Sequence, residues 1–374
     1  MDLHSLPTPA LVLDVARLRR NVARMRERAR ALGVRLRPHV KTHKCVEIAR
    51  LQTEDPDRAV TVSTLAEAAA FAAHGFRDIT YAVPIEPGKF GAALDLVAAG
   101  LGLRVITDDE GVAGALDGAA TSRGVTLDVF VKVDCGYHRC GVDPAGRAAL
   151  DVPRRIARAR GLRLAGLLTH AGHAYHAATR DERLAIAREE RDVMVRLAAR
   201  LRAAGVEVPV VSIGSTPTLT VIDALDGVDE IRPGNYALFD AFQATLGTCA
   251  WDDCALTVLA AVVSRECGRR QVVLDAGAIA LSKDQGALWL DPECGYGRVL
   301  DLEGRDLGLR VTSVSQEHGV VRAREEEAAS IDRLPVGARV RILANHACLT
   351  AAQHDSFHVL EGDRIVDRWA ILRG

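Results

Sequence analysis

The sequence predicts an α/β protein made of a (β/α)8 barrel of the TIM type and a C-terminal antiparallel β-domain. Between Val34 and Arg232, eight strand-like segments alternate with Ala-rich or amphipathic segments, which is the order of a closed parallel barrel. Several of these segments are apolar along their whole length, as strands covered on both faces should be. After about Gly247, helical periodicity fades and short strand-like runs separated by Gly and Asp turns take over, a pattern typical of antiparallel sheets.

The individual elements follow from the spacing of apolar residues. Ala10–Asp14 is a short apolar strand, and apolar residues three or four positions apart between Leu18 and Ala29 predict the first helix. Asp181–Ala204 is the clearest amphipathic helix of the barrel. The barrel strands are predicted at Val34–Val40, Ala59–Ser63, Ile79–Val83, Leu103–Thr107, Leu127–Asp134, Leu162–His170, Val208–Ile213 and Val228–Arg232. The strands of the β-domain are predicted at Leu256–Ser264, Gln271–Asp275, Leu309–Gln316, Ala338–Ala344 and Phe357–Leu360.

Length and composition exclude several classes of protein. The chain has 374 residues, too many for one ordinary core and suited to two domains. A formal net charge of -1 gives no broad electrostatic basis for binding nucleic acid or an anionic membrane. No apolar run reaches membrane-spanning length, and the N-terminus shows no secretory signal. The eight scattered cysteines favour reduced thiols and a cytoplasmic location.

Basic residues gather in the segment Arg37–Lys44, at the end of the first predicted barrel strand. Because side chains alternate along a strand, Arg37, His39 and Lys41 are expected on one face. Three cations inside a barrel mouth need an anion to offset their repulsion and desolvation. A lysine in such surroundings has its pKa lowered toward the free amine, the form that attacks carbonyls. A solvated basic turn is the alternative interpretation of this segment.

Two loops are predicted to bind a phosphate group. Barrels of this type often bind phosphate with the loops after strands seven and eight. The motif Gly214-Ser215-Thr216-Pro217 follows strand seven, where the glycine permits close approach of the backbone, Thr216 can cap and the proline suits a first helical turn. The motif Gly234-Asn235-Tyr236 follows strand eight and offers a second set of amides. Both motifs at the expected strand ends indicate an anion site.

Aromatic and cationic side chains follow strands five and six. Arg139 lies in the glycine-bounded loop Asp134–Gly141 and is a fixed cation. The segment after strand six carries His170 and Tyr175, whose rings could stack on an aromatic cofactor. We expect the other histidines of that segment, His173 and His176, to be exposed.

A candidate metal pair follows the predicted strand Ala338–Ala344. If the extended conformation continues, His346 and Cys348 lie on one face and can ligate one metal ion. Imidazole and thiolate suit Zn²⁺, and two protein ligands leave positions for water or substrate. A buried cysteine beside a surface histidine is the alternative.

These motifs resemble the fold-type III pyridoxal-phosphate enzymes, in the branch that holds D-serine dehydratase and D-threonine aldolase. The likeness covers essentially the whole chain, from Thr8-Pro9-Ala10 to His346-Ala347-Cys348. It implies an alanine racemase-like barrel over residues 15–245 and a β-domain formed by residues 1–14 and 246–374. The strand at Ala10–Asp14 would then belong to the β-domain. The resemblance also implies a homodimer and a small D-amino-acid substrate.

The resemblance assigns cofactor roles to individual residues. It implies that Lys41 carries pyridoxal 5'-phosphate covalently and serves as catalytic base, with His39 beside it, and that Arg139 holds the phenolate oxygen of the cofactor. The phosphate contacts would be Gly214, Ser215, Thr216, Gly234, Asn235 and Tyr236. Tyr175 and Arg232 are rival contacts of the pyridine nitrogen, and His170 is a neighbour of the ring.

The resemblance also implies a metal and a set of reactions. His346 and Cys348 would bind Zn²⁺, Mn²⁺ or another divalent ion, and His318 would touch the substrate or support the metal. We expect a lyase that acts on D-3-hydroxy amino acids, foremost a D-serine or D-threo-3-hydroxyaspartate dehydratase. A D-threonine aldolase is the alternative, followed by a racemase. A non-enzymatic cofactor carrier is disfavoured because such carriers consist of the barrel alone.

Overall fold

The computed structural model describes residues 2–53, 58–325 and 327–372. Contacts divide the chain into two compact units, and each is considered by itself. The barrel unit consists of Arg24–Lys41 and Ala49–Gly234. The β-unit consists of the described residues up to Ala23, the segment Thr42–Ile48 and the described residues from Asn235 onward. The domain boundaries expected from the sequence, at residues 14/15 and 245/246, stay a prediction.

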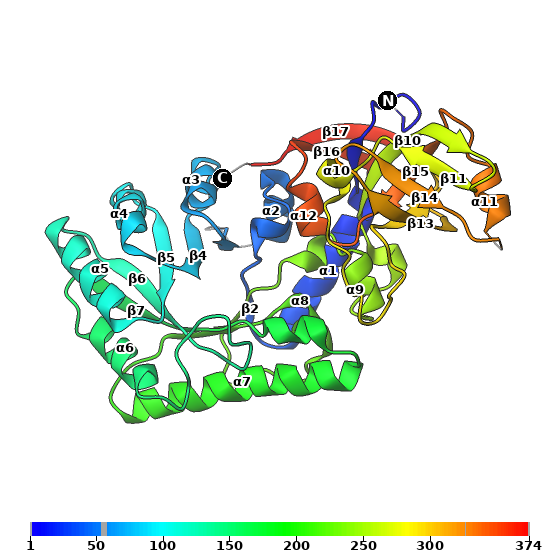
Figure 1. Ribbon diagram of the computed structural model, residues 1–374. Coiled ribbons are helices and arrows are strands. Elements are labelled where there is room, and N and C mark those ends of the chain that lie inside the picture. The colour runs from blue at the N-terminus through cyan, green and yellow to red at the C-terminus, as the bar shows by residue number, and fades with distance from the viewer. Residues whose placement is uncertain (1, 54–57, 326, 373–374) are drawn as a thin grey trace. The chain divides into compact units, whose positions relative to one another are not determined.

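The barrel unit is built on eight parallel strands, with helices between them (Figure 1). The strands are β2 (Arg35–Leu36), β3 (Val60–Val62), β4 (Asp78–Pro84), β5 (Gly102–Thr107), β6 (Leu127–Lys132), β7 (Leu162–Leu168), β8 (Val210–Ile213) and β9 (Glu230–Ile231). Their order in the sheet is β2-β9-β8-β7-β6-β5-β4-β3. A parallel bridge between His39 and Thr61 joins the two ends of this sheet, so the strands close into the predicted barrel.

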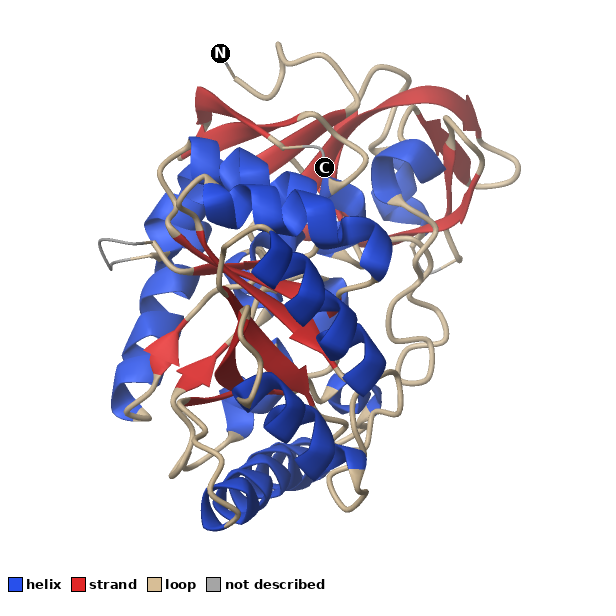
Figure 2. Ribbon diagram, turned by 90° about the vertical axis from the view of Figure 1, so that its left-hand side faces the viewer, coloured by secondary structure: helices blue, strands red, loops and turns tan. Residues whose placement is uncertain are grey.

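Helices connect these strands and cover the outside of the sheet (Figure 2). They are α3 (Leu65–Ala73), α4 (Phe90–Ala98), α5 (Glu110–Ser122), α6 (Ala148–Ala157), α7 (Arg180–Ala203) and α8 (Thr216–Val221), while α1 (Val15–Ala31) and α2 (Val46–Gln52) each run from one unit into the other. The longest, α7, begins at a capping box in which Thr179 accepts from the Glu182 amide and the Glu182 side chain bonds back to the N-cap. Such a cap satisfies amides that the first helical turn leaves unpaired.

All eight predicted barrel strands are present. The first is shorter in regular structure than Val34–Val40, although its backbone pairing continues beyond Leu36. The amides of Arg35, Arg37 and His39 donate in turn to the carbonyls of Asp229, Ile231 and Pro233, each at 2.9 Å. The chain then leaves the sheet in a 3₁₀ turn over Val40–Thr42, so Lys41 lies just beyond the end of the strand.

The β-unit contains a closed antiparallel barrel of six strands. In order around it are β11 (Gln271–Leu274), β14 (Gly319–Arg322), β13 (Asp306–Val314), β12 (Arg298–Leu300), β15 (Arg339–Leu343) and β10 (Leu256–Glu266), and β10 also pairs with β11. From β10 the sheet extends through β1 (Ala10–Asp14), β16 (Ser356–Glu361) and β17 (Arg364–Ala370). The short helices α9 (Ala241–Thr245), α10 (Ala278–Leu281), α11 (Ala328–Asp332) and α12 (Ala347–Ala351) complete the unit.

The first strand of the chain belongs to this β-unit, as the resemblance implied. β1 pairs antiparallel with β10 and parallel with β16, so it lies between two strands from the C-terminal part of the chain. Its residues Ala10 and Val12 pack with Leu259 and Leu360 in a buried apolar cluster. This pairing ties the N-terminus to a sheet formed more than 240 residues later.

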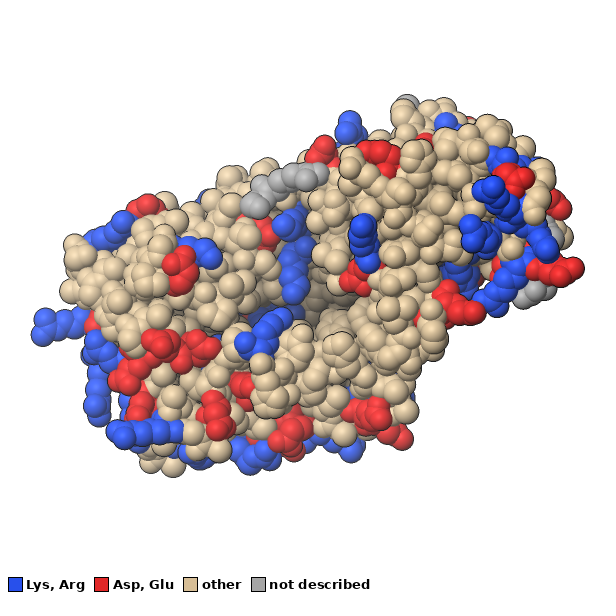
Figure 3. Space-filling view, in the orientation of Figure 1, with Lys and Arg blue, Asp and Glu red and all other residues tan. Residues whose placement is uncertain are grey.

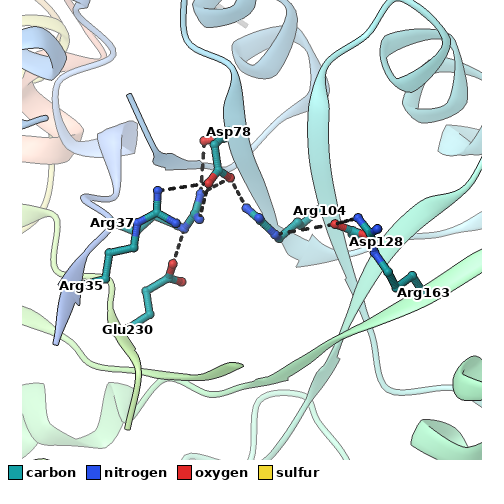
Figure 4. A network of polar contacts seen from close by, with 7 residues as sticks. All are labelled: Arg35, Arg37, Asp78, Arg104, Asp128, Arg163 and Glu230. Carbon is teal, nitrogen blue, oxygen red and sulfur yellow. Dashed lines mark hydrogen bonds and ion pairs between the residues drawn. The ribbon is translucent and has the colours of Figure 1, made fainter. Parts of the chain in front are cut away.

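Arg37 does not belong to the basic cluster predicted at the barrel mouth, and this part of the prediction is wrong. Its guanidinium is 1% exposed and donates to Glu230 Oε2 at 2.6 Å and to both carboxylate oxygens of Asp78 at 2.6 and 2.9 Å. Burial alone would lower the pKa of Arg37, but the two carboxylates raise it. Figure 4 shows that the network continues through Arg104 and Asp128.

Asp78, Asp128 and Glu230 stand at or near the beginning of their strands. The network therefore marks the N-terminal end of the barrel, where residues serve stability rather than catalysis. Alternation along the strand predicts only which residues share a face. The carboxylates that hold Arg37 lie on strands remote in the sequence, so the pattern could not show that Arg37 pairs with this end of the barrel.

The surface carries charges of both signs. On the face shown in Figure 3, basic and acidic side chains of the described residues are interspersed, in keeping with the net charge of -1. Within the described parts of the chain, no helix combines the length and the apolar character that are needed to cross a membrane.

Candidate active site

The C-terminal ends of the barrel strands bring several cationic side chains together. Lys41 and His39 follow β2, His170 follows β7 and Arg232 follows β9. Burial, followed by the charges of Lys41 and Arg232, holds the pKa of His39 well below its ordinary value. Burial and the charges of Lys41, Lys132, Arg139 and Arg232 do the same for His170. The predicted convergence of His39 and Lys41 is thus present, with partners from other strands in place of Arg37.

The loop that carries Arg139 is held in a fixed shape. Asp134 Oδ1 accepts hydrogen bonds from the amides of Gly136 and His138, each at 3.0 Å. His138 has a φ of 56°, in the left-handed region that is uncommon for residues other than glycine but is more accessible to asparagine, aspartate and histidine. The Arg139 guanidinium lies over the ring of Tyr137, 5.2 Å from its centroid. Arg139 is therefore presented by a rigid turn rather than by a mobile surface loop.

An aromatic group surrounds His170. Tyr137 meets His170 edge to face at a centroid distance of 6.2 Å, and Tyr175 lies 6.4 Å from His170 on a short 3₁₀ helix. His173 stacks on Tyr137 at 6.2 Å and is half-buried, so the expectation that it is exposed is wrong. His176 is exposed as expected. Tyr137 was not among the residues predicted from the sequence, although its place in the Arg139 loop is a signal that points to it.

Arg232 is buried and already held by the barrel. Its Nη1 donates to Ser212 Oγ at 2.6 Å, and its Nη2 donates to the carbonyl oxygen of Thr169. Ser212 in turn donates to Glu230 Oε1 at 2.7 Å. Burial lowers the pKa of Arg232 to about 10. Lys132, a buried lysine at the end of β6, was not among the residues predicted from the sequence. Its Nζ donates to the Val133 carbonyl at 3.0 Å, and burial lowers its pKa.

The predicted phosphate loop after β8 has the expected construction with one correction. Gly214 is buried with a φ of +107°, and a Cβ there would lie 3.0 Å from Leu219. Ser215, not Thr216, is the N-cap of α8, because the Ser215 and Thr218 side chains form a reciprocal capping box. Thr216 and the proline after it are the first two helical residues. The loop needs glycine for both its conformation and its space.

The second predicted phosphate motif spans the division between the two units. Gly234 ends the barrel unit, and Asn235 and Tyr236 begin the β-unit in a short 3₁₀ helix. All three residues are buried. The Asn235 side chain donates to Asp240 Oδ2 at 2.7 Å. Whether this motif meets a phosphate stays a prediction.

The candidate metal pair lies in the β-unit. The sequence analysis placed both residues in an extended segment after β15. The extended conformation does not continue through both of them. His346 is extended and forms the N-cap of α12, and Cys348 is the second residue of that helix. Each nevertheless alters the ionisation of the other. Burial lowers the pKa of His346, but Asp284 and Cys348 outweigh it and raise the pKa to about 11. His346 lowers the pKa of Cys348 although burial opposes this.

Second-sphere contacts orient the pair. Asp284 Oδ2 lies 2.8 Å from His346 Nδ1, which leaves Nε2 as the nitrogen available to a metal, the usual arrangement of a ligating histidine. Cys348 Sγ lies 3.5 Å from Thr42 Oγ1 and 3.9 Å from Asn235 Nδ2. Neither Asp284 nor these neighbours were among the residues predicted from the sequence.

Asp240 fixes the turn on which the pair is built. Its Oδ2 accepts from the Ala347 amide at 2.9 Å and from Asn235 at 2.7 Å, and its Oδ1 caps α9 through the Gln243 amide at 2.9 Å. Burial raises the pKa of this carboxyl. Over the described part of the chain, no group of three or more His, Cys, Asp or Glu side chains is arranged to enclose a metal ion. Metal binding by the pair stays a prediction.

His318 is exposed in the turn between β13 and β14, where its carbonyl accepts from the Ser315 amide at 2.8 Å. Its predicted contact with substrate or metal stays a prediction. Nearby Asp275 has a structural role. It accepts hydrogen bonds from Thr8 Oγ1 at 2.5 Å and from the Ala261 amide at 2.7 Å.

Comparison with known proteins identifies both parts of the chain. Residues 13–241 match the alanine racemase N-terminal domain, and residues 255–360 match a serine dehydratase domain. The chain therefore belongs to the alanine racemase-like, fold-type III pyridoxal-phosphate enzymes. Within them it is a member of the D-serine dehydratase family of lyases. The resemblance inferred from the sequence is confirmed.

Three relatives span nearly the whole chain. D-threo-3-hydroxyaspartate dehydratase of Delftia sp. (strain HT23) is 43% identical over 100% of this chain and 99% of its own. D-serine dehydratase of Dictyostelium discoideum is 35% identical over 97% of this chain and 95% of its own. D-threonine aldolase of Arthrobacter sp is 32% identical over 99% of this chain and 93% of its own.

The solved structure of the Delftia dehydratase superposes on this chain with a TM-score of 0.95 at 42% identity, covering 100% of this chain and 99% of the other. That enzyme has also been solved as a cysteine-to-alanine variant in a metal-free form and as a histidine-to-alanine variant.

Proposed function

We propose that this protein is a pyridoxal-phosphate- and divalent-metal-dependent lyase that eliminates the β-hydroxyl of a D-3-hydroxy amino acid, foremost D-threo-3-hydroxyaspartate or D-serine, and releases a keto acid and ammonia as net products. The observation that carries the proposal is the pair His346 and Cys348, with Asp284 orienting the histidine. Dehydration requires help for a poor leaving group, the β-hydroxyl, and a Lewis acid supplies such help. Two of the relatives named above are dehydratases of these substrates.

The barrel unit fits pyridoxal phosphate. Burial, followed by the charges of neighbouring cations, holds the pKa of both His39 and His170 well below its ordinary value, and the gathered cations favour an anion in this place. A phosphate and a phenolate would supply that anion. Lys41 provides the amine. Gly214 is buried and has little room for a Cβ, so its loop offers a backbone that a phosphate can approach closely.

Each residue then has a definite task. The cofactor, when bound, acts as an electron sink for charge developing at the substrate's α-carbon. Lys41 Nζ would hold the cofactor, and its free amine would take the α-proton of the substrate. Arg139, fixed over Tyr137, would hold the phenolate oxygen. For the pyridine nitrogen we favour Tyr175, because both terminal nitrogens of Arg232 already donate to the barrel.

The donor set of the metal pair also fits its proposed ion. A thiolate and a neutral imidazole are the ligands that zinc prefers, and Mn²⁺ or another divalent ion is the alternative. His346 would ligate through Nε2 and Cys348 through Sγ. When bound, the ion would supply Lewis acidity to the β-hydroxyl of the substrate. In the Delftia enzyme, the histidine and cysteine chosen for substitution are two residues apart, which is the spacing of His346 and Cys348.

A D-threonine aldolase is the second candidate function, supported by the relative in Arthrobacter. A product assay separates the two. Incubation with D-threo-3-hydroxyaspartate, D-serine and D-threonine should yield ammonia and a keto acid from a dehydratase, whereas glycine and an aldehyde would establish the aldolase. Interconversion of D- and L-alanine without either product would point to a racemase.

We also propose that the protein works in a reducing compartment as a homodimer. Its eight cysteines are unpaired, as is usual in the cytoplasm. The homodimer is expected from the family and can be tested by light scattering.

A further inference from the structure

A buried carboxylate on α7 has no role in the chemistry proposed above. Glu190 is 1% exposed and lies on the core-facing side of the helix, in a series with Ala187, Met194 and Leu197 at helical spacing. Burial of an ionisable side chain is costly unless it is well bonded. Helices rarely place glutamate at such a position without a specific partner.

One oxygen of Glu190 joins two loops of the barrel mouth. Oε1 accepts a hydrogen bond from the Ala171 amide at 2.9 Å and another from the Gly214 amide at 3.1 Å. Ala171 directly follows His170 in the loop after β7, and Gly214 opens the loop after β8. The amide nitrogens of Ala171 and Gly214 are therefore close neighbours, because both contact the same oxygen atom.

The bridge takes over where the sheet ends. The last backbone hydrogen bond between β7 and β8 runs from the Thr169 amide to the Ser212 carbonyl at 3.0 Å. Beyond it the chains diverge, one toward His170 and Tyr175 and the other toward the cap of α8. Backbone amides at diverging ends would otherwise be buried without partners. Glu190 satisfies both and sets their separation.

The second carboxylate oxygen strengthens this interpretation. Glu190 Oε2 is buried and has no hydrogen-bond partner among the described residues. The carboxyl group is thus held through Oε1 alone. Burial raises the pKa of Glu190, while the two amides and the charges of Arg232 and Lys132 lower it.

We infer that Glu190 is a positioning residue that fixes the distance between the loop holding the cofactor's phosphate and the loop facing its ring. This inference rests on the proposed binding of pyridoxal phosphate. Glu190 itself would not touch the cofactor. It acts through the hydrogen bonds that it accepts, from its place on α7, from the backbone amides of the two loops. Its loss should loosen cofactor binding and change the orientation of the ring, with Lys41 unaltered.

The test compares three variants in the apo and cofactor-loaded full-length protein. Glu190→Ala removes the acceptor, and Glu190→Gln retains a carbonyl oxygen that both amides can use. Leu201→Ala is the matched control, because Leu201 is fully buried on the same helix, three turns farther along. The measurements are the Kd for pyridoxal phosphate, the visible circular dichroism of the bound cofactor and the thermal midpoint of the apoprotein.

Glu190→Ala should weaken pyridoxal phosphate binding by about tenfold or more, as the loss of buried hydrogen bonds implies, and should alter the circular dichroism band. Glu190→Gln should stay within about threefold of the wild type. Leu201→Ala should lower the thermal midpoint but leave Kd and band unchanged. Wild-type Kd and band in Glu190→Ala would overturn the inference, as would a Gln variant as defective as the Ala variant.

Failure of the proposed function would look different. In that case the wild-type protein itself would not bind pyridoxal phosphate, and borohydride would trap no adduct on Lys41.

Discussion

Replacement of Arg37 by alanine tests the corrected role of this residue. The guanidinium is 1% exposed and bonded to Glu230 and Asp78 at 2.6 Å each, and the Glu230 side chain is itself only 4% exposed. Removing one member of a buried pair leaves an uncompensated charge and costs roughly 3–5 kcal/mol. We expect a loss of that order in the free energy of unfolding of the barrel, measured by urea denaturation.

The network in Figure 4 supplies its own control. Arg163 also pairs with a carboxylate, Asp128, at 2.6 Å, but its side chain is 72% exposed. Such an exposed pair contributes only about 0–1 kcal/mol, so Arg163→Ala should be nearly neutral. Where the Arg37→Ala protein remains folded, its Kd for pyridoxal phosphate should equal that of the wild type. A weakened Kd together with unchanged stability would refute the reasoning and return Arg37 to the cofactor site.

The pH dependence of the same variant gives the sign of the effect. Arg37 holds the pKa of Asp78 and of Glu230 below their ordinary values despite burial. Groups with a lowered pKa in the folded state stabilise the protein above their unfolded pKa, about 4 for these carboxyls. The wild type should lose this stability as the pH falls below about 4. The Arg37→Ala protein should show less of that loss.

Three further predictions concern the cofactor. Lys41→Ala should abolish both activity and the adduct trapped by borohydride, and an adduct trapped elsewhere would move the assignment. Gly214→Val should release pyridoxal phosphate on dialysis, because valine cannot easily adopt a φ of +107° and its Cβ would press on Leu219; full retention would remove this loop from the phosphate site. Tyr175→Phe should shift the visible absorption maximum of the bound cofactor, and Arg232→Lys should chiefly lower thermal stability. An absorption shift in the Arg232 variant, with none in the Tyr175 variant, would make Arg232 the ring contact.

The sequence was most informative where a local pattern decides the structure. The barrel strands are continuous apolar runs, so their positions could be predicted although their order of closure could not. In the β-unit, β12, β14 and β17 were missed. β17 mixes charged and apolar residues without regular alternation and is mostly exposed, and β14 is only four residues long and begins with a glycine. Such strands exist because a neighbour pairs with them, which a local pattern does not reveal.

The candidate site shows the same limit. Lys41, Arg139 and the two glycine loops were found because each follows a strand. The carboxylates that hold the candidate metal pair in place could not be predicted, because they are remote from it in the chain. Asp284 is 62 residues from His346, and Asp240 is 107 residues from the Ala347 amide that it holds. Buried carboxylates of this kind have no sequence signature beyond an acidic residue in an apolar setting.

The central claim is that His346 and Cys348 bind a divalent metal ion needed for the elimination. The direct measurement is metal content, by elemental analysis, alongside the release of ammonia from D-threo-3-hydroxyaspartate and D-serine. The wild type should hold stoichiometric metal, lose activity on chelation and regain it with Zn²⁺ or Mn²⁺. Cys348→Ala should lack metal and activity yet keep the borohydride-trapped cofactor, while Cys267→Ala, a control at an exposed thiol, should keep all three. Full activity in a demonstrably metal-free wild-type preparation would contradict the account.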